Sequence, residues 1–206
     1  MKKPYKLPDY LEASGNRYPI KTGYREWMEF EQILDRPDLT DEEKQVFALR
    51  KVLKGPAPHE PLVFLELFLQ AAWFCRCGLP VVPGDDGRKT LDFYKDFWAV
   101  WADFLTYNGV DLLKDDLHWW QFMALFQSLP EDAQIKRRIN IRSITYGELS
   151  KIKNSKQRRQ IRRLQELYSL DDYSEEDDDQ TERETIPSAF ATKGNKQIKQ
   201  KKSGIV

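Results

Sequence analysis

Cysteine and histidine are scarce in this chain of 206 residues, and their scarcity excludes two kinds of site. Cys75 and Cys77 lie two positions apart in an apolar helical pattern, so a bridge between them would be strained. No other cysteine offers a partner, which excludes a disulfide-stabilised secreted domain. His59 and His118 are isolated, whereas a metal site needs several ligands at fixed geometry. We therefore expect no metal site and no cofactor, and we expect His118 to be a capped or partly exposed side chain.

Motifs for catalysis and for nucleotide binding are also missing. Gly84-Asp85-Asp86-Gly87 follows no strand and lacks the spacing of a phosphate-binding loop. Neither histidine lies in a recognisable nucleophile motif, so Ser/His/Asp catalysis has no support. The acidic pairs Asp85/Asp86 and Asp115/Asp116 fit a loop and a helix start better than a cation site. The sequence therefore predicts a protein that is not an enzyme and has no catalytic residues.

An excess of charge of one sign and a long apolar run are absent as well. The chain has 33 Lys and Arg against 33 Asp and Glu, which disfavours binding of the whole molecule to nucleic acid or membrane by charge. The longest apolar block, from Leu62 to Cys75, is too short to span a bilayer and includes Glu66 and Gln70. The first residues lack the apolar run of a signal peptide. We expect a cytosolic protein with no membrane partner.

Aromatic residues, in contrast, make up 13% of the chain and recur at helical spacing. Trp119, Phe122, Met123 and Phe126 fall at i, i+3, i+4 and i+7 and form one continuous apolar stripe. The helix that carries them is apolar nearly all round, so it cannot face water. We expect it to run through the centre of the domain, with its rings packed in the core.

Periodicity between capping residues and helix breakers predicts the other helices. They begin at Thr22, the capping box Thr40–Glu43, Pro61, Leu91, the capping box Ser128–Glu131, the capping box Thr145–Glu148 and Ser155. The helix from Pro61 has only a narrow polar strip, so we expect it to be deeply buried, with Gly78 as its C-cap. The helix from Leu91 is expected to run to about Tyr107 and to be closed by Asn108-Gly109.

The segment before these helices predicts a β-hairpin, and the segment after them a disordered tail. Residues 9–13 and 17–21 alternate around the turn Ser14-Gly15-Asn16, and Pro19 confines the second strand to an edge. From Asp171 the chain is first acidic and then rich in lysine, with almost nothing to bury. We therefore expect a mainly α fold of three parts. These are an N-terminal segment 1–21 whose hairpin packs on the core, a compact domain of about six to eight helices over 22–170, and a disordered charged tail over 171–206.

The strongest local charge lies between Lys136 and Arg163, a stretch with eleven Lys or Arg and one acid, Glu148. In its last helix, the apolar side is formed by Ile161, Leu164, Leu167 and Tyr168. The opposite side is expected to present four arginines, Arg158, Arg159, Arg162 and Arg163. Three interpretations stay open for this basic face: an ordinary solvated surface, a site for an acidic or helical protein, or a surface that follows a phosphate backbone.

Several segments, in this order, resemble one family of phage proteins. They are Thr22–Glu31 after a short hairpin, Asp38–Lys44, Ala72–Gly78, Ala102–Phe104, Leu117–Phe126, Leu149–Lys153 and a basic helix that ends at Leu167-Tyr168. The run Leu117-His118-Trp119-Trp120 is the most specific of them. Together they resemble the bacteriophage "gene product fifteen" family of siphophages that infect Gram-positive bacteria, over about residues 17 to 170.

The resemblance implies a role in assembling the phage tail. Members of that family are encoded near the tail-tube and tape-measure genes, which implies a tail assembly chaperone that binds the tape-measure protein, the tail-tube protein or both in the host cytoplasm. A structural tail component that remains in the virion is one alternative, and a nucleic-acid-binding regulator that uses the basic helix is another. The resemblance supplies no catalytic residues. A homo-oligomer is compatible with it, and nucleic acid is the least favoured partner.

Overall fold

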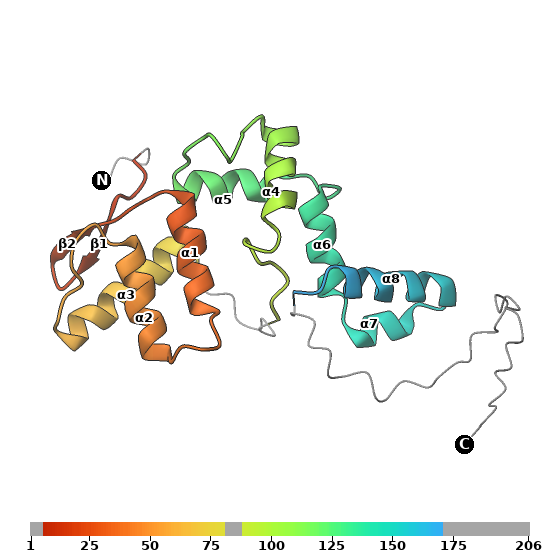
Figure 1. The fold of residues 1–206 in the computed structure, drawn as a ribbon, viewed down its shortest axis with the longest axis horizontal. Coiled ribbons are helices and arrows are strands. Elements are labelled where there is room, and N and C mark those ends of the chain that lie inside the picture. Colours follow the sequence, from red (N-terminus) through yellow and green to blue (C-terminus); the bar gives the residue numbers. More distant parts are fainter. Residues whose placement is uncertain (1–5, 81–87, 171–206) are drawn as a thin grey trace, which may run out of the picture. The chain divides into compact units, whose positions relative to one another are not determined.

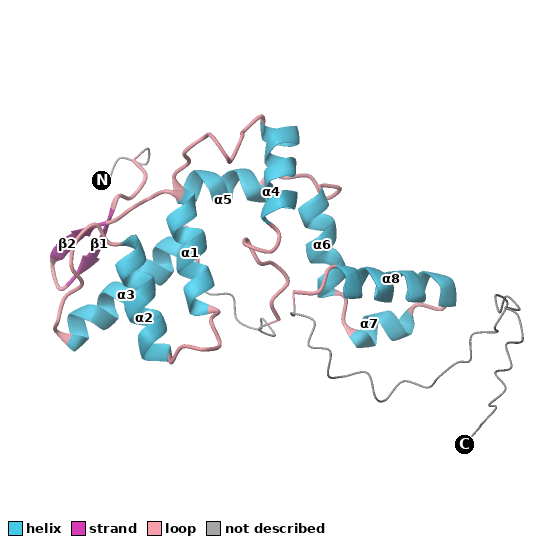
Figure 2. Ribbon diagram, viewed as in Figure 1, coloured by secondary structure: helices cyan, strands magenta, loops and turns pink. Residues whose placement is uncertain are grey.

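A computed structural model describes residues 6–80 and 88–170. Over this part of the chain the fold is mainly helical, with one two-stranded hairpin at its beginning (Figures 1 and 2), and this confirms the predicted fold class. The elements are β1 (Tyr10–Ala13), β2 (Asn16–Pro19), α1 (Tyr24–Leu34), α2 (Asp41–Val52), α3 (Pro61–Cys75), α4 (Phe97–Asp103), a π-helical turn η1 (Phe104–Asn108), α5 (Trp119–Gln127), α6 (Gln134–Ser143), α7 (Tyr146–Lys151) and α8 (Ser155–Leu167). The predicted tail over 171–206 and most of the predicted loop after Gly78 lie outside the described residues.

The hairpin forms where its sequence predicts it. Tyr10 pairs with Pro19 and Ala13 with Asn16, so Ser14 and Gly15 form the two-residue turn. Both turn residues have positive φ, 47° and 77°, which is the conformation that a tight hairpin turn requires. The carboxylate of Glu66 on α3 accepts hydrogen bonds from the Ser14 backbone N–H at 2.8 Å and from its hydroxyl at 2.9 Å. These bonds fasten the hairpin to α3.

The core is built around α5, as its aromatic stripe predicts. Trp119 and Phe122 are fully buried, and Phe126 is almost so. The Phe122 ring stacks on Tyr24 of α1, with centroids 5.1 Å apart, and on Phe104, with centroids 4.9 Å apart. Such stacked pairs stabilise beyond the area that they bury. The aromatic rings of α5 therefore serve packing.

A short backbone bridge joins the starts of α1 and α5 and changes the predicted cap. The N–H of Tyr24 donates to the carbonyl of Leu117 at 3.0 Å, and the N–H of Trp119 donates to that of Thr22 at 2.7 Å. Gly23, which lies between the bridged positions, is the N-cap of α1, so the prediction that Thr22 caps this helix is wrong. His118 caps α5, because its Nδ1 accepts from the Trp120 N–H at 3.0 Å. The expectation of a capped or partly exposed histidine is confirmed.

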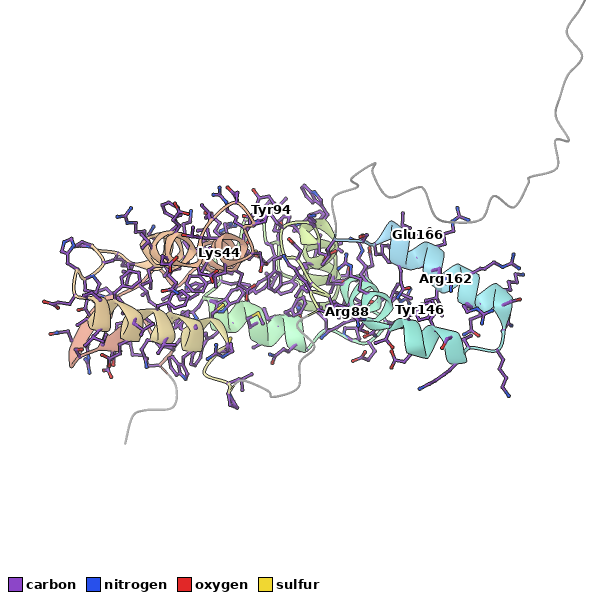
Figure 3. All side chains as sticks on the ribbon, turned by 90° about the horizontal axis from the view of Figure 1, so that it is seen from below. Lys44, Arg88, Tyr94, Tyr146, Arg162 and Glu166 are labelled. Atoms are coloured by element: carbon purple, nitrogen blue, oxygen red, sulfur yellow. The ribbon has the colours of Figure 1, made fainter. Side chains whose placement is uncertain are left out.

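α3 departs most from its prediction. Its side chains Leu67, Ala71 and Phe74 are buried, whereas Leu62 and Leu69 are 82% and 60% exposed. The helix contacts β1 and α2 through one side only, and Figure 3 shows α3 and α5 on the opposite side from α1 and α2. The expectation of a deeply buried helix is therefore wrong, because an apolar composition does not tell how many neighbours a helix has.

The predicted helix from Leu91 begins later than expected. Asp92 accepts hydrogen bonds from the N–H groups of Tyr94 at 2.8 Å and Lys95 at 2.9 Å, which holds this segment in a turn. Regular helix starts only at Phe97, and Gly109, with φ of 66°, closes it as predicted. No helix in the described parts of the chain combines the length and apolarity needed to cross a bilayer.

Candidate functional site

The predicted basic surface lies on α8, which packs on α6. The side chain of Gln165 donates to the carbonyls of Ile141 at 3.0 Å and Ile144 at 2.8 Å. Arg142 of α6 donates through Nε to the carbonyl of Tyr168 at 2.5 Å, just after the end of α8. Polar side chains thus fix both the position and the direction of α8 against α6.

Two arginines of the predicted basic stretch, Arg138 and Arg142, form ion pairs inside the fold. Asp96, at the start of α4, is 1% exposed, and its two oxygens accept from Arg142 Nη1 at 2.6 Å and Nη2 at 2.9 Å. Arg138 Nη1 donates to the same carboxylate at 3.3 Å. A two-pronged pair of this kind satisfies both a buried carboxylate and a buried guanidinium. Arg138 and Arg142 therefore connect α6 to α4 and are not available to a partner.

A second buried acid of α4 holds the start of α6. Asp103 accepts from the N–H groups of Gln134 at 3.1 Å and Ile135 at 2.8 Å, so it satisfies the first donors of that helix from another element. Ser128 was predicted to open this helix, and that prediction is wrong. Ser128 follows the last residue of α5, and its hydroxyl donates to the carbonyl of Leu125 at 2.8 Å.

The four predicted arginines do not lie on one face. Arg158 is half-buried, and its Nη1 reaches the carbonyl of Ile152 at 3.5 Å, on the side where α8 packs. Arg159, Arg162 and Arg163 are exposed, and none of them makes an ion pair with another described residue. Arg162 is labelled on α8 in Figure 3. The structure therefore brings three of the four together as an exposed cationic surface, which we call the arginine face.

The capping box before α7 forms as predicted. Thr145 Oγ1 accepts from the Glu148 N–H at 3.1 Å, and the Glu148 carboxylate accepts from the Thr145 N–H at 2.8 Å. The bonds that the carboxylate accepts from the Thr145 N–H and from the Thr145 hydroxyl, at 2.9 Å, favour its ionised form and lower the pKa of Glu148 below its ordinary value. The single acid of the basic stretch is thus used locally, and it leaves the arginine face without a neutralising partner in that stretch.

An open groove between α1 and the start of α4 was not predicted from the sequence. It has a volume of about 370 Å³, and Tyr24, Met28, Phe93, Tyr94, Phe97 and Trp98 line it, with Arg25 and Glu29 at its polar positions. Tyr94 and Trp98 are 67% and 66% exposed. These two rings, four residues apart, lie off the apolar stripe of that helix, and this offset is the one sequence signal that could have indicated an open surface. We call this feature the aromatic groove.

A small cluster of two titratable side chains lies between α1 and α3. Cys75 Sγ lies 3.3 Å from Glu31 Oε1, and loss of hydration raises the pKa of Glu31 to about 7. The same burial raises the pKa of Cys75 well above its ordinary value, so this thiol is not an activated nucleophile. Among the described residues no group of three or more Cys, His, Asp or Glu is arranged to hold a metal ion.

Comparison with known proteins identifies the family. The model of the Bacteriophage Gp15 protein family matches residues 5–170, which confirms the resemblance seen in the sequence. No curated protein and no solved structure matches the chain. The family is one of phage structural and morphogenesis proteins and is not known as an enzymatic family. Because the match spans well over half of its length, the chain belongs to the Bacteriophage Gp15 protein family.

Proposed function

We propose that this chain is a tail assembly chaperone that works without catalysis in the host cytoplasm. It binds the tape-measure protein, the tail-tube protein or both, and releases them as the tail assembles. Membership of a phage morphogenesis family supports the general role. The aromatic groove is the observation that supports the specific role, the binding of another tail protein.

The aromatic groove has the properties of a surface that binds protein. Large aromatic side chains that stay exposed in a folded domain are typical of interaction sites, because they bury much area at low cost in side-chain entropy. Phe93, which is buried, and Phe97, which is half-buried, line the groove, and Trp98 is exposed beside them. A helix of the partner that inserts two or three apolar side chains would cover these rings.

The arginine face supplies the second part of the surface. Arg159 and Arg162 lie on the exposed side of an ordered helix, so their cations attract acidic segments of a partner over a distance of about 10 Å. Charge of this kind speeds association and adds little to the lifetime of the complex. Fast association with a short-lived complex suits a chaperone that must release the protein it binds.

Co-expression with the tape-measure protein of the same phage tests the proposal. The wild-type chain is expected to copurify with the tape-measure protein and to keep it from aggregating. Tyr94→Ala and Trp98→Ala, which remove exposed rings of the groove, are expected to lower the affinity about tenfold or more. Tyr146→Ala is the matched control, because Tyr146 is 79% exposed on α7, away from the groove. Absence of any complex at low salt contradicts the proposal.

Two other functions are distinguished by direct measurements. A structural tail component is found in purified virions by mass spectrometry, whereas a chaperone is absent from them. A nucleic-acid-binding regulator binds duplex DNA or RNA with strong dependence on salt, and loses that binding when Arg159 and Arg162 are replaced. The burial of Arg138 and Arg142 in pairs with Asp96 shortens the basic stretch that such a regulator would use.

A further inference from the structure

The residues of α6, α7 and α8 carry an excess of exposed positive charge. Between Gln134 and Leu170 seven exposed side chains are cationic, and none of them makes an ion pair with another described residue. They are the three arginines of the arginine face and Arg137, Lys151, Lys153 and Lys156. The exposed acids of this stretch are Glu166 and Glu148, and Glu148 is already used in its capping box. Seven cations against two acids leave an excess of five positive charges, so an acidic segment is the occupant that this surface attracts.

The end of the described chain is anchored at the end of α8. The carbonyl of Tyr168 accepts a hydrogen bond from Arg142 Nε at 2.5 Å, and the carbonyl of Leu170 accepts one from the ammonium group of Lys95. The guanidinium of Arg138 lies over the Tyr168 ring, 5.2 Å from its centroid. The chain therefore leaves α8 from a position that α6 and the residues before α4 hold.

The residues that follow are the most acidic segment of the chain. Seven of the nine residues from Asp171 to Asp179 are Asp or Glu and none is basic, and we call them the acidic segment. Arg159 lies eight residues before Leu167, which corresponds to about 12 Å along the helix. An extended chain covers about 3.3 Å per residue, so the nine residues span up to about 30 Å. The acidic segment is therefore long enough to pass all the arginines of the arginine face.

Two physical factors favour the acidic segment as the occupant of the arginine face. Only residues 168–170 separate it from α8, so its effective concentration there is on the order of millimolar. Exposed ion pairs that are too weak to hold a free peptide are then sufficient. A guanidinium can also bind a carboxylate through two parallel hydrogen bonds, which an ammonium group cannot. The arginines are therefore stronger competitors for these acids than the five lysines of residues 193–202.

From the excess of positive charge, the anchored end of α8 and the acids that follow it, we infer that the acidic segment binds the arginine face of its own chain when no partner is present. It occupies this face as the acidic segment of a partner would, so a partner must displace it. The contact itself is independent of the proposed function, whereas the competition with a client protein rests on it. The acidic segment thereby excludes weakly acidic proteins and admits those with a higher density of acids.

Binding of a ten-residue glutamate peptide to the full chain at low salt tests the competition. Neutralising the acidic segment is expected to tighten binding of the peptide about threefold or more, because the arginine face loses its internal competitor. The neutralised variant carries Glu176→Gln, Asp177→Asn, Asp178→Asn and Asp179→Asn. Replacing Arg159 and Arg162 by Gln in the same chain is expected to abolish this gain.

A matched control removes the same amount of charge at exposed positions outside α6, α7 and α8. It carries Glu42→Gln, Glu60→Gln, Glu131→Gln and Asp132→Asn, and it is expected to bind the peptide almost as the wild type does. Circular dichroism checks that every variant is folded. Equal gains in the two variants, or no gain in the neutralised variant, overturn the inference.

Nuclear magnetic resonance of the full chain alone tests the contact itself. Neutralising the acidic segment is expected to shift the Nε–H signals of Arg159, Arg162 and Arg163. The difference from the wild type is expected to disappear at about 1 M salt, where the Debye length is about 3 Å. Absence of these shifts at low salt overturns the inference. Because no client protein takes part, this result is separate from the test of the proposed function, which fails only when the tape-measure protein is not bound.

Discussion

Asp96 is one of two buried carboxylates of α4 that attach α6, and it is the one that pairs with arginine side chains. Its carboxylate is buried and serves Arg138 and Arg142 together. Asp96→Asn keeps the shape but leaves a buried guanidinium without its counter-charge, so we expect the free energy of unfolding to fall by about 3–5 kcal/mol. Urea denaturation measures the change.

The exposed Asp132 provides the comparison for this prediction. It lies in the turn before α6 and makes no side-chain hydrogen bond with another described residue, so Asp132→Asn is expected to change the free energy of unfolding by less than about 0.5 kcal/mol. If Asp96→Asn is equally mild, the pair does not hold the two helices together.

The raised pKa of Glu31 predicts how the free energy of unfolding depends on pH. Its pKa is raised to about 7 from an ordinary 4.5, so the folded state binds a proton that the unfolded state has lost at neutral pH. The stabilisation is complete below about pH 4.5 and is lost as the pH rises through about 7. Because the side chain keeps some contact with water, we expect a loss of about 1–2 kcal/mol. Urea midpoints at pH 5 and pH 8 are expected to differ for the wild type and much less for Glu31→Gln. Equal differences in the two proteins would exclude Glu31 as the cause.

At the scale of the element, the start of α6 has a different cap in the structure from the one that its sequence predicts. The capping-box spacing points to Ser128, whereas the structure assigns the cap to Asp103. We expect Asp103→Ala to lower the free energy of unfolding by about 1–2 kcal/mol and to speed amide exchange at Gln134 and Ile135. Ser128→Ala is expected to be nearly neutral. The reverse order of these two effects would restore the cap that the sequence predicts.

Local signals in the sequence predicted those elements whose determinants are themselves local. The capping boxes at Thr40 and Thr145 and the closing Gly109 act through their nearest neighbours and are found as predicted. The hairpin turn is also found, but it is one residue shorter than predicted, because Asn16 already pairs in β2. The same reasoning failed at the starts of α1 and α6, where the cap depends on a residue far away in the sequence. Thr22 does not cap α1, because its carbonyl instead accepts a hydrogen bond from Trp119 at the start of α5. The start of α6 is capped by Asp103, which lies 31 residues earlier in the chain than Gln134.

The prediction that α3 is deeply buried failed for a related reason. Its sequence is apolar on most sides, and periodicity alone cannot distinguish a face covered by the same chain from a face left for another molecule. Leu62 and Leu69 are leucines like those of the core, yet 82% and 60% of their surface stays exposed in the described structure. A fully buried helix and a helix with one exposed apolar side therefore have similar sequences, and only their neighbours in the fold distinguish them.

At the scale of the whole molecule, the absence of catalytic motifs was visible in the sequence, but the shape of the candidate site was not. The stretch from Lys136 to Arg163 was identified by its charge, and three of the four predicted arginines do form a common face. Arg158 falls on a packed side of α8, because its Nη1 reaches the carbonyl of Ile152 at the end of α7. The aromatic groove joins α1 to the start of α4, and such a junction depends on tertiary packing.

Under the proposed function, this chain acts by binding a protein partner through its exposed aromatic groove and arginine face. The most direct measurement is the affinity for the tape-measure protein of the same phage, compared between two variants that change the net charge equally. These are Arg159→Glu with Arg162→Glu on the arginine face, and Arg50→Glu with Lys54→Glu at exposed positions of α2 and the residues after it. We expect about fivefold or greater weakening for the first variant and almost none for the second, with the difference shrinking at high salt. Equal affinities for both variants, or no binding by the wild type at low salt, would contradict the account.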